Sequence, residues 1–305
     1  MSTPPPALAE QASNLGWPQP DRLDSFTGVS KRGFHRVAYV EWGDAGSDRV
    51  VICLHGLTRQ GRDFDRLAAA LAAQGWRVVC PDLPGRGQSD PLLDPADYNL
   101  PQYAMDMTAL IARLGVDQVS WIGTSLGGLT GIVMAGQPRS PIRRMVVNDI
   151  GPFLPWEALH RIATNVSKAP RVFRNLDAAR AHTRTSLAPF GNLSDDEWDH
   201  LTRHGVEELP DGQYAVLCDA GISVAFGQNL LFNLSLWNYW DRIACPTLVM
   251  RGAASDLLRP GTLAEMGRRG PRAETVTIPG CGHAPALLDQ SQISLVVDWL
   301  NAAPD

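Results

Sequence analysis

The chain has 305 residues and a formal net charge of −5, with 44% hydrophobic and 19% charged residues, which is ordinary usage for a globular protein. A chain of this length can bury one large core, or one core that carries an inserted lid. Like charges do not gather in blocks, and no apolar run reaches the roughly 18 residues of a membrane-spanning helix. We therefore expect neither a nucleic-acid partner nor membrane insertion.

The N-terminal residues 1–24 predict an extended arm, because they are rich in proline and show no apolar period. They also lack the basic-then-apolar order of a secretion signal. The five cysteines are scattered without a CxxC pair, and most lie in or beside apolar segments, so buried thiols are expected rather than disulfides. These features favour a cytoplasmic protein.

From residue 25 onward, short apolar runs alternate with longer helical patterns, which indicates an α/β fold with a mostly parallel sheet and helices on both faces. The predicted strands cover residues 35–41, 49–54, 78–80, 118–122, 145–147, 247–250 and 274–278. The predicted helices cover residues 64–74, 98–114 and 125–135, with an amphipathic helix near the C-terminus around 293–300.

One segment breaks this alternation. Residues 152–240 show helical patterns and no buried strand, as where Ser194 precedes an acidic helix start. We expect an all-helical lid inserted into a core formed by residues 25–151 and 241–305. Its aromatic side chains are candidates to line a pocket, although each could equally pack inside the lid: Phe153, Trp156, Phe226, Phe232 and Trp237.

The sequence Gly123-Thr124-Ser125-Leu126-Gly127 matches the pattern GxSxG. The pattern alone is weak in a glycine-rich chain, but here it follows a predicted buried strand and opens a predicted helix. A sharp turn between strand and helix exposes the serine, and the flanking glycines leave room for the crowded backbone. Ser125 is therefore the candidate nucleophile.

A serine hydroxyl needs a base, and the base needs a carboxylate to orient it. At such a turn these residues follow later in the chain, at strand ends, in the order Ser, Asp, His. His283 lies in a glycine-containing loop after the last predicted strand, which makes it the candidate base. The remaining histidines fall in the lid or near early strands.

Two aspartates follow predicted strands and could orient His283. Asp149 lies in Asn-Asp-Ile-Gly-Pro, where a short acid is well suited to bonding local backbone N–H groups at a turn. Asp256 lies beyond Gly252 in a longer loop, where its side chain is freer to reach the imidazole. We therefore predict Asp256 as the third catalytic residue, and Asp149 is the alternative.

Hydrolysis through a serine also requires two N–H groups aimed at the developing oxyanion. Leu126, directly after the candidate nucleophile, should supply one of them. The loop after residues 49–54 reads His55-Gly56-Leu57-Thr58, and we assign the second donor to Leu57. His55 lies too early in the chain to act as the base, so we expect it to hold this loop by hydrogen bonds.

Together these motifs resemble the α/β-hydrolase fold superfamily, in its branch of serine carboxylesterases, over residues 26–300. The stretch 81–90, which reads PDLPGRGQSD, and the Asn148–Pro152 stretch belong to the same resemblance. The resemblance implies an eight-stranded sheet and hydrolysis of esters through an acyl-enzyme. Haloalkane dehalogenases and epoxide hydrolases of this fold use an aspartate nucleophile, so Ser125 argues against both.

The leading hypothesis is a carboxylesterase acting on a small-molecule ester without metal or cofactor. Cleavage of a carbon–carbon bond in ring-fission products, or of a lactone, is the alternative reaction. A ligand receptor on the same scaffold is an alternative of another class. The sequence indicates neither the natural substrate nor the oligomeric state.

Overall fold

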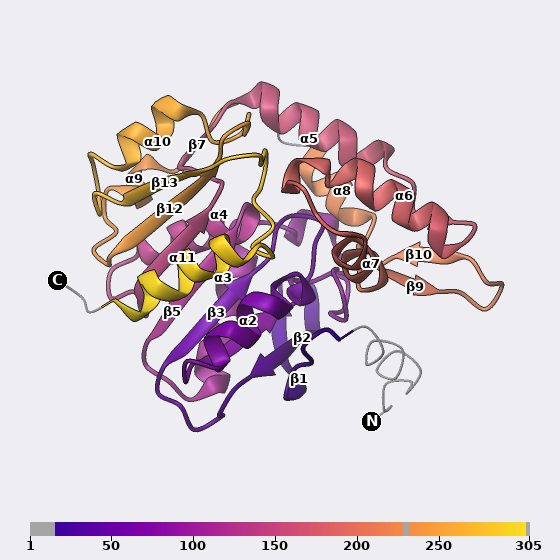
Figure 1. Cartoon of the computed structure of the whole chain (residues 1–305), viewed down its shortest axis with the longest axis horizontal. Helices are drawn as coiled ribbons and strands as arrows, with labels where there is room; N and C mark the ends of the chain where they lie inside the picture. The colour runs from indigo at the N-terminus through magenta and orange to yellow at the C-terminus, as the bar shows by residue number, and fades with distance from the viewer. Residues whose placement is uncertain (1–15, 228–231, 303–305) are drawn as a thin grey trace.

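The computed structural model describes residues 16–227 and 232–302, and its central feature is an eight-stranded sheet (Figure 1). The strand order is β1-β2-β4-β3-β5-β6-β12-β13. The first two strands run antiparallel to their neighbours, and the remaining pairs are parallel. The strands are β1 (Arg22–Ser30), β2 (Gly33–Trp42), β3 (Val50–Leu54), β4 (Arg77–Pro81), β5 (Val119–Thr124), β6 (Ile142–Asn148), β12 (Thr247–Gly252) and β13 (Glu274–Ile278).

Burial explains which runs of sequence became central strands. Every residue of β3 is buried, as is expected for a continuous apolar run covered on both faces. In β13, at the edge of the sheet, no residue is fully buried. The predicted fold class, an eight-stranded and mostly parallel sheet flanked by helices, is confirmed.

Helices cover both faces of the sheet. On one face α2 (Asp65–Ala72) and α11 (Gln290–Asn301) pack against each other and share one apolar cluster with β3, β4 and β12. In Figure 1 these two helices lie in front of the strands. The other face carries α3 (Leu100–Leu114), α4 (Leu126–Ala135), α9 (Trp237–Trp240) and α10 (Pro260–Met266), which contribute to a second and larger cluster.

The predicted insertion lies between β6 and β12 and gathers on one side of the molecule (Figure 1). Its longer helices are α5 (Trp156–Lys168), α6 (Leu176–Ser186), α7 (Asp195–Arg203) and α8 (Gly221–Gly227), and the short α9 at its end packs against α4 of the core. The predicted helix start after Ser194 is confirmed, because its side chain and that of Glu197 form a reciprocal capping box at the start of α7.

The expectation of an all-helical insertion is wrong. The insertion also contains the three-stranded sheet β8-β10-β9, formed by β8 (Val172–Phe173), β9 (Val206–Glu208) and β10 (Tyr214–Val216). A further pair joins β7 (Phe153–Leu154) to β11 (Leu234–Ser235). Strands of two or three residues bury too few side chains to leave a period of two in the sequence.

The predicted N-terminal arm also differs from the structure in its described part. Residues 1–15 lie outside the described residues, but β1 begins at Arg22, inside the predicted arm. Trp17 is buried against the insertion, in a small cluster with Trp198 and Leu201 of α7. Among the described helices, none is long and apolar enough to cross a membrane.

Candidate active site

Ser125 occupies a sharp turn between β5 and α4, as the motif predicts. Its backbone has φ 52° and ψ −112°, a region that costs a non-glycine residue about 1–3 kcal/mol. The flanking glycines make the turn possible. A Cβ atom at Gly123 would collide with the backbone of Gly127, and one at Gly127 would collide with the carbonyl oxygen of Leu54. The turn therefore presses against β3, and Ser125 stands at its tip.

The structure brings Ser125 and His283 together from elements 158 residues apart. The Nε2 atom of His283 lies 2.9 Å from Oγ of Ser125. Its other ring nitrogen, Nδ1, lies 2.7 Å from Oδ2 of Asp149. With the proton on Nδ1, His283 donates to the carboxylate, and Nε2 is free to accept the serine proton.

Asp149 follows β6 and is completely buried. Besides His283, its carboxylate accepts hydrogen bonds from the backbone N–H of Gly252 at 2.8 Å and from the hydroxyl of Ser255 at 2.6 Å. Its own backbone N–H donates to the carbonyl of Met250 at 2.8 Å. These donors satisfy the oxygens of the carboxylate inside the protein.

The predicted contact between Asp256 and His283 is wrong. The Asp256 side chain is 61% exposed and forms an ion pair with Arg161 of α5, with 2.5 Å between the charged atoms. The loop after β12 turns at Ser255, whose buried side chain faces Asp149, and the next residue points outward. The alternative acid, Asp149, occupies the position next to the imidazole.

Sequence reasoning missed Ser255 and misjudged Asp149. The Asn-Asp-Ile-Gly-Pro stretch was interpreted as a local turn, but the Asp149 carboxylate bonds to groups more than 100 residues away in the chain. One usable signal was present. Asp149 directly follows β6, whereas three residues separate Asp256 from Gly252 at the end of β12, so the Asp256 side chain is not fixed at the strand end.

Both predicted oxyanion donors lie beside Ser125. Leu126 follows it in the chain, and Gly56, next to Leu57, comes so close that a Cβ atom there would lie 3.6 Å from Ser125 Cβ. Among the described residues, the backbone N–H groups of Leu57 and Leu126 donate to no carbonyl or side chain. Unpaired N–H groups at this position are available to a developing negative charge.

Comparison with known proteins gives the chain a family. Residues 49–290 match the family of the alpha/beta hydrolase fold. The chain belongs to this family. The α/β-hydrolase is 41% identical to the 3-hydroxybutyrate-oligomer hydrolase of Cupriavidus necator, an alignment that covers 92% of this chain and 98% of that protein. The resemblance seen in the motifs is thereby confirmed.

Solved structures show the same likeness. A protein from Rickettsia typhi superposes with a TM-score of 0.86 at 28% identity, covering 93% of this chain and 100% of that one. An α/β-hydrolase from Novosphingobium aromaticivorans gives a TM-score of 0.79 at 34% identity, covering 91% of this chain and 98% of its own.

His55 holds the loop before Leu57, as expected for this α/β-hydrolase. Its Nε2 atom accepts the backbone N–H of Leu83 at 2.9 Å, so the ring proton is on Nδ1, which donates to the carbonyl of Gly56 at 2.7 Å. Burial lowers the pKa of His55 to about 3, and the positive charge of Arg86 acts in the same direction. The ring therefore stays neutral and keeps this tautomer at physiological pH.

The aromatic side chains proposed to line a pocket have separate surroundings. Trp156 is 45% exposed and Phe232 78% exposed, whereas Trp237 is partly buried beneath the guanidinium of Arg269 at 4.3 Å. Phe153 is also partly buried, at the start of the insertion, and the side chain of Phe226 lies outside the described residues. Trp237 packs against the core, so its role as a pocket residue is not supported.

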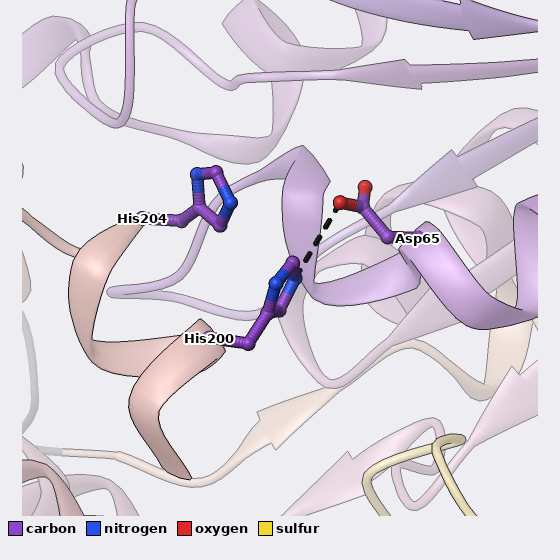
Figure 2. A group of neighbouring side chains, drawn as sticks. All are labelled: Asp65, His200 and His204. Carbon is purple, nitrogen blue, oxygen red and sulfur yellow. Dashed lines mark ion pairs between the residues drawn. The ribbon is translucent and has the colours of Figure 1, made fainter. Parts of the chain in front are cut away.

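One group of side chains has the composition of a metal site: Asp65 of α2, His200 of α7 and His204 directly after that helix (Figure 2). Their potential ligand atoms lie within 4.8 Å of one another. However, Arg62 already holds the Asp65 carboxylate at 2.6 Å, and Nε2 of His200 donates to the Arg62 carbonyl at 3.0 Å. Two of the three groups that would bind a cation, Asp65 and His200, are engaged by protein partners, so we interpret the cluster as a junction between the insertion and the core.

His200 makes this junction sensitive to pH. Its ring stacks on Trp17 at 3.7 Å between centroids and lies 3.4 Å from Asp65. Burial lowers the pKa of His200 to about 4, and the positive charges of Arg62, Arg59 and Arg66 act in the same direction. In the unfolded chain a histidine titrates near 6.5, so the unfolded chain takes up a proton first. The contribution of neutral, buried His200 to the free energy of unfolding is therefore complete above about pH 6.5 and is lost as the pH falls toward about 4.

Replacing His200 with glutamine should flatten the pH dependence of stability. Between pH 6.5 and 5 the wild type should lose about 2 kcal/mol more unfolding free energy than His200→Gln, since each pKa unit corresponds to about 1.4 kcal/mol. Urea unfolding at several pH values measures the slope of unfolding free energy against pH for the wild type and for the variant. His160→Gln, at an exposed position on α5, is the control and should follow the wild type. Equal slopes for His200→Gln and the wild type would show that His200 does not titrate in this way.

Proposed function

We propose that this α/β-hydrolase cleaves the ester bonds of short 3-hydroxybutyrate oligomers, with Ser125 as the nucleophile, His283 as the general base and Asp149 as the orienting acid. The chain is a carboxylic ester hydrolase. The hydrogen-bonded series from Ser125 through His283 to Asp149 supports the mechanism. The similarity to the C. necator oligomer hydrolase along nearly the whole chain supports the substrate.

Acylation begins when Ser125 Oγ attacks the carbonyl carbon of an ester bond and Nε2 of His283 accepts the hydroxyl proton. The carbonyl oxygen becomes negatively charged and accepts hydrogen bonds from the N–H groups of Leu57 and Leu126. Asp149 stabilises the imidazolium formed in this step. The intermediate then collapses and expels the alkoxide of the neighbouring unit, which takes the proton from His283 and leaves as an alcohol.

Deacylation repeats these steps with water. His283 accepts a proton from the water molecule, which attacks the acyl carbon, and the second oxyanion meets the same donors. Collapse releases the acid and returns the proton to Ser125 Oγ. Each cycle therefore consumes one water and divides an oligomer into two shorter chains, one with a new hydroxyl end and one with a new carboxyl end.

We propose that residues 152–240 form a cap over this site, on a core made of residues 25–151 and 241–305. Contacts with the loops that carry the catalytic groups support this assignment. The backbone N–H of Gly282, next to His283, donates to the carbonyl of Pro189 in the insertion at 2.7 Å. Arg161 of α5 pairs with Asp256, next to Ser255. The insertion thus borders the site on the side of the imidazole.

The cysteines support a reducing compartment, and we propose the cytoplasm. All five are unpaired thiols, and four are buried. Cys53 and Cys80 lie on the paired strands β3 and β4, and both are buried. Free cysteines in buried positions are typical of proteins that work where glutathione keeps thiols reduced.

Incubation with 3-hydroxybutyrate dimer and trimer should release the monomer, measured by chromatography, and Ser125→Ala should lower this rate by several orders of magnitude because the catalytic residues act as a unit. Retained circular dichroism is the control for folding of the variant. If the protein hydrolyses p-nitrophenyl butyrate but releases no 3-hydroxybutyrate monomer, it is an esterase whose substrate is not the proposed oligomer. Release of one equivalent of product per protein, followed by no further turnover, would indicate a receptor. Cleavage of a ring-fission product, with no hydrolysis of the esters, would indicate a carbon–carbon bond hydrolase.

Asp149→Asn should lower kcat by about 10⁴-fold, because the amide favours the wrong imidazole tautomer. Asp256→Asn is the matched control and should leave kcat close to the wild-type value, because an exposed ion pair contributes only about 0–1 kcal/mol. Both purified variants are compared for kcat and thermal midpoint. The assignment of the acid is wrong if Asp256→Asn is the inactive variant and Asp149→Asn turns over normally.

A further inference from the structure

Arg86 is a completely buried cation in the loop after β4, within the PDLPGRGQSD stretch. Its Nη1 atom donates to the carbonyl of Pro84 at 2.7 Å and to the hydroxyl of Tyr103 at 3.0 Å. Its Nε atom donates to the carbonyl of Leu57 at 2.9 Å. Its Nη2 atom has no hydrogen-bond partner among the described residues, and none of their carboxylates forms an ion pair with it.

A buried guanidinium without a carboxylate is unusual, because burial of an unpaired charge is strongly unfavourable. The rings of Tyr98 and Tyr103 compensate in part, with their centroids 5.4 and 5.2 Å from the guanidinium carbon. Neutral oxygens and aromatic faces do not neutralise the charge. A buried group that stays incompletely satisfied calls for an explanation, and function is one of the common ones.

Arg86 contacts the loop after β3, which carries the predicted oxyanion donor Leu57. The N–H of Leu57 belongs to the same peptide unit as the carbonyl of Gly56, and His55 binds that carbonyl. Arg86 binds the next carbonyl, that of Leu57 itself. Side chains on both sides therefore fix the two peptide planes that flank Leu57. Since a peptide unit is planar, fixing its carbonyl also fixes the direction of its N–H.

The loop that carries Arg86 is itself held in place. Gly87 has φ 52°, and a Cβ atom there would collide with the carboxylate of Asp82. The two oxygens of that carboxylate accept the backbone N–H groups of Gly61 at 2.7 Å and Gln88 at 2.8 Å. The glycine and the acid of this motif thus give Arg86 a rigid base, which a residue that positions another group requires.

We propose that Arg86 is the positioning residue of the oxyanion hole: it orients the Leu57 peptide, and its uncompensated positive charge stabilises the oxyanion formed at Ser125. This inference rests on the proposed function of that serine. The carbonyl oxygen carries a full negative charge only in the tetrahedral intermediate, so Arg86 assists the transition state more than substrate binding. The stabilisation is preorganised, because the guanidinium does not move when the charge appears.

Two substitutions test the orientation and the charge in turn. Arg86→Lys keeps the charge and loses the guanidinium geometry, and Arg86→Gln loses the charge and keeps an amide that can reach a carbonyl. We expect kcat to fall about 10- to 100-fold in both, with KM nearly unchanged, which is less than the roughly 10²- to 10³-fold cost of removing an oxyanion donor itself. Arg59→Lys is the control. Arg59 lies two residues after Leu57 and forms an ion pair with Asp63, so the kcat of this variant should equal the wild-type value.

A trifluoromethyl ketone, which adds to a serine and forms a stable oxyanion, supplies a readout that a purely structural role would not change. Its inhibition constant should rise across the variants in proportion to the loss in kcat/KM. In the Ser125→Ala background, binding of the intact ester should not change. If Arg86→Gln proves unstable, Tyr103→Phe removes one partner of the guanidinium and should lower kcat less, again without a change in KM.

The inference is overturned if KM rises while kcat is retained, since Arg86 would then serve substrate binding. It is also overturned if inhibition by the ketone is unchanged while kcat follows the thermal midpoint, which would indicate a structural role. Wild-type kcat in Arg86→Gln together with an inactive Ser125→Ala would contradict this inference alone. Activity in Ser125→Ala would remove the proposed function as well.

Discussion

The Asp149 carboxylate is completely buried, and its need for hydrogen-bond donors fixes the geometry around it. The donors come from separate segments: the backbone of Gly252 at the end of β12, the hydroxyl of Ser255 in the following loop, and the ring of His283 after β13. Because β6 and β12 are paired in parallel, with Asn148 opposite Met250, Asp149 reaches this point directly from its strand end. If that register shifted, the imidazole would lose its orientation and Ser125 its base. The central sheet pairing and the chemistry therefore depend on the same contact.

The oxyanion side of the site follows the opposite rule. The Asp149 carboxylate has protein donors on both oxygens, whereas the N–H groups of Leu57 and Leu126 have no partner in the described part of the chain. The protein keeps them in place indirectly, through the strained turn at Ser125 and through the side chains of His55 and Arg86 on the neighbouring carbonyls. A donor that is rigid and unpaired in the resting protein needs no reorganisation when negative charge develops. The Asp149 side of the site thus depends on hydrogen bonds that the protein makes, and the side of Leu57 and Leu126 depends on N–H groups that it leaves unpaired.

The sequence predicted most of the fold, and two of the three residues that meet at the site, for identifiable reasons. Long apolar runs such as β3 report burial on both faces, and GxSxG between a strand and a helix admits few other geometries. To choose between Asp149 and Asp256 one must know the path of the loop after β12. That path depends on which N–H groups of the loop face the end of the strand. Local sequence gives only the distance of each acid from the end of its strand, not the path of the loop. The small strands of the insertion were missed because they are two or three residues long. The first strand was missed in part because only two of its nine residues are buried.

The insertion is joined to the core partly through contacts of a different kind from those inside the core. Arg66 pairs with Glu197, Arg161 with Asp256, and His200 meets Asp65 beside the ring of Trp17. Polar contacts of this kind are common between parts of one chain, and here Leu154, Ala158 and Ile222 of the insertion also join the main core cluster. The proposed catalytic residues Ser125 and Asp149 directly follow strands of the core sheet, and His283 lies in the loop after β13. Movement of the insertion would therefore change access to the site while the hydrogen bonds among these three residues persist. For the proposed oligomeric ester this separation has a use, because the acyl-enzyme would form on a rigid core while the rest of the substrate enters and leaves.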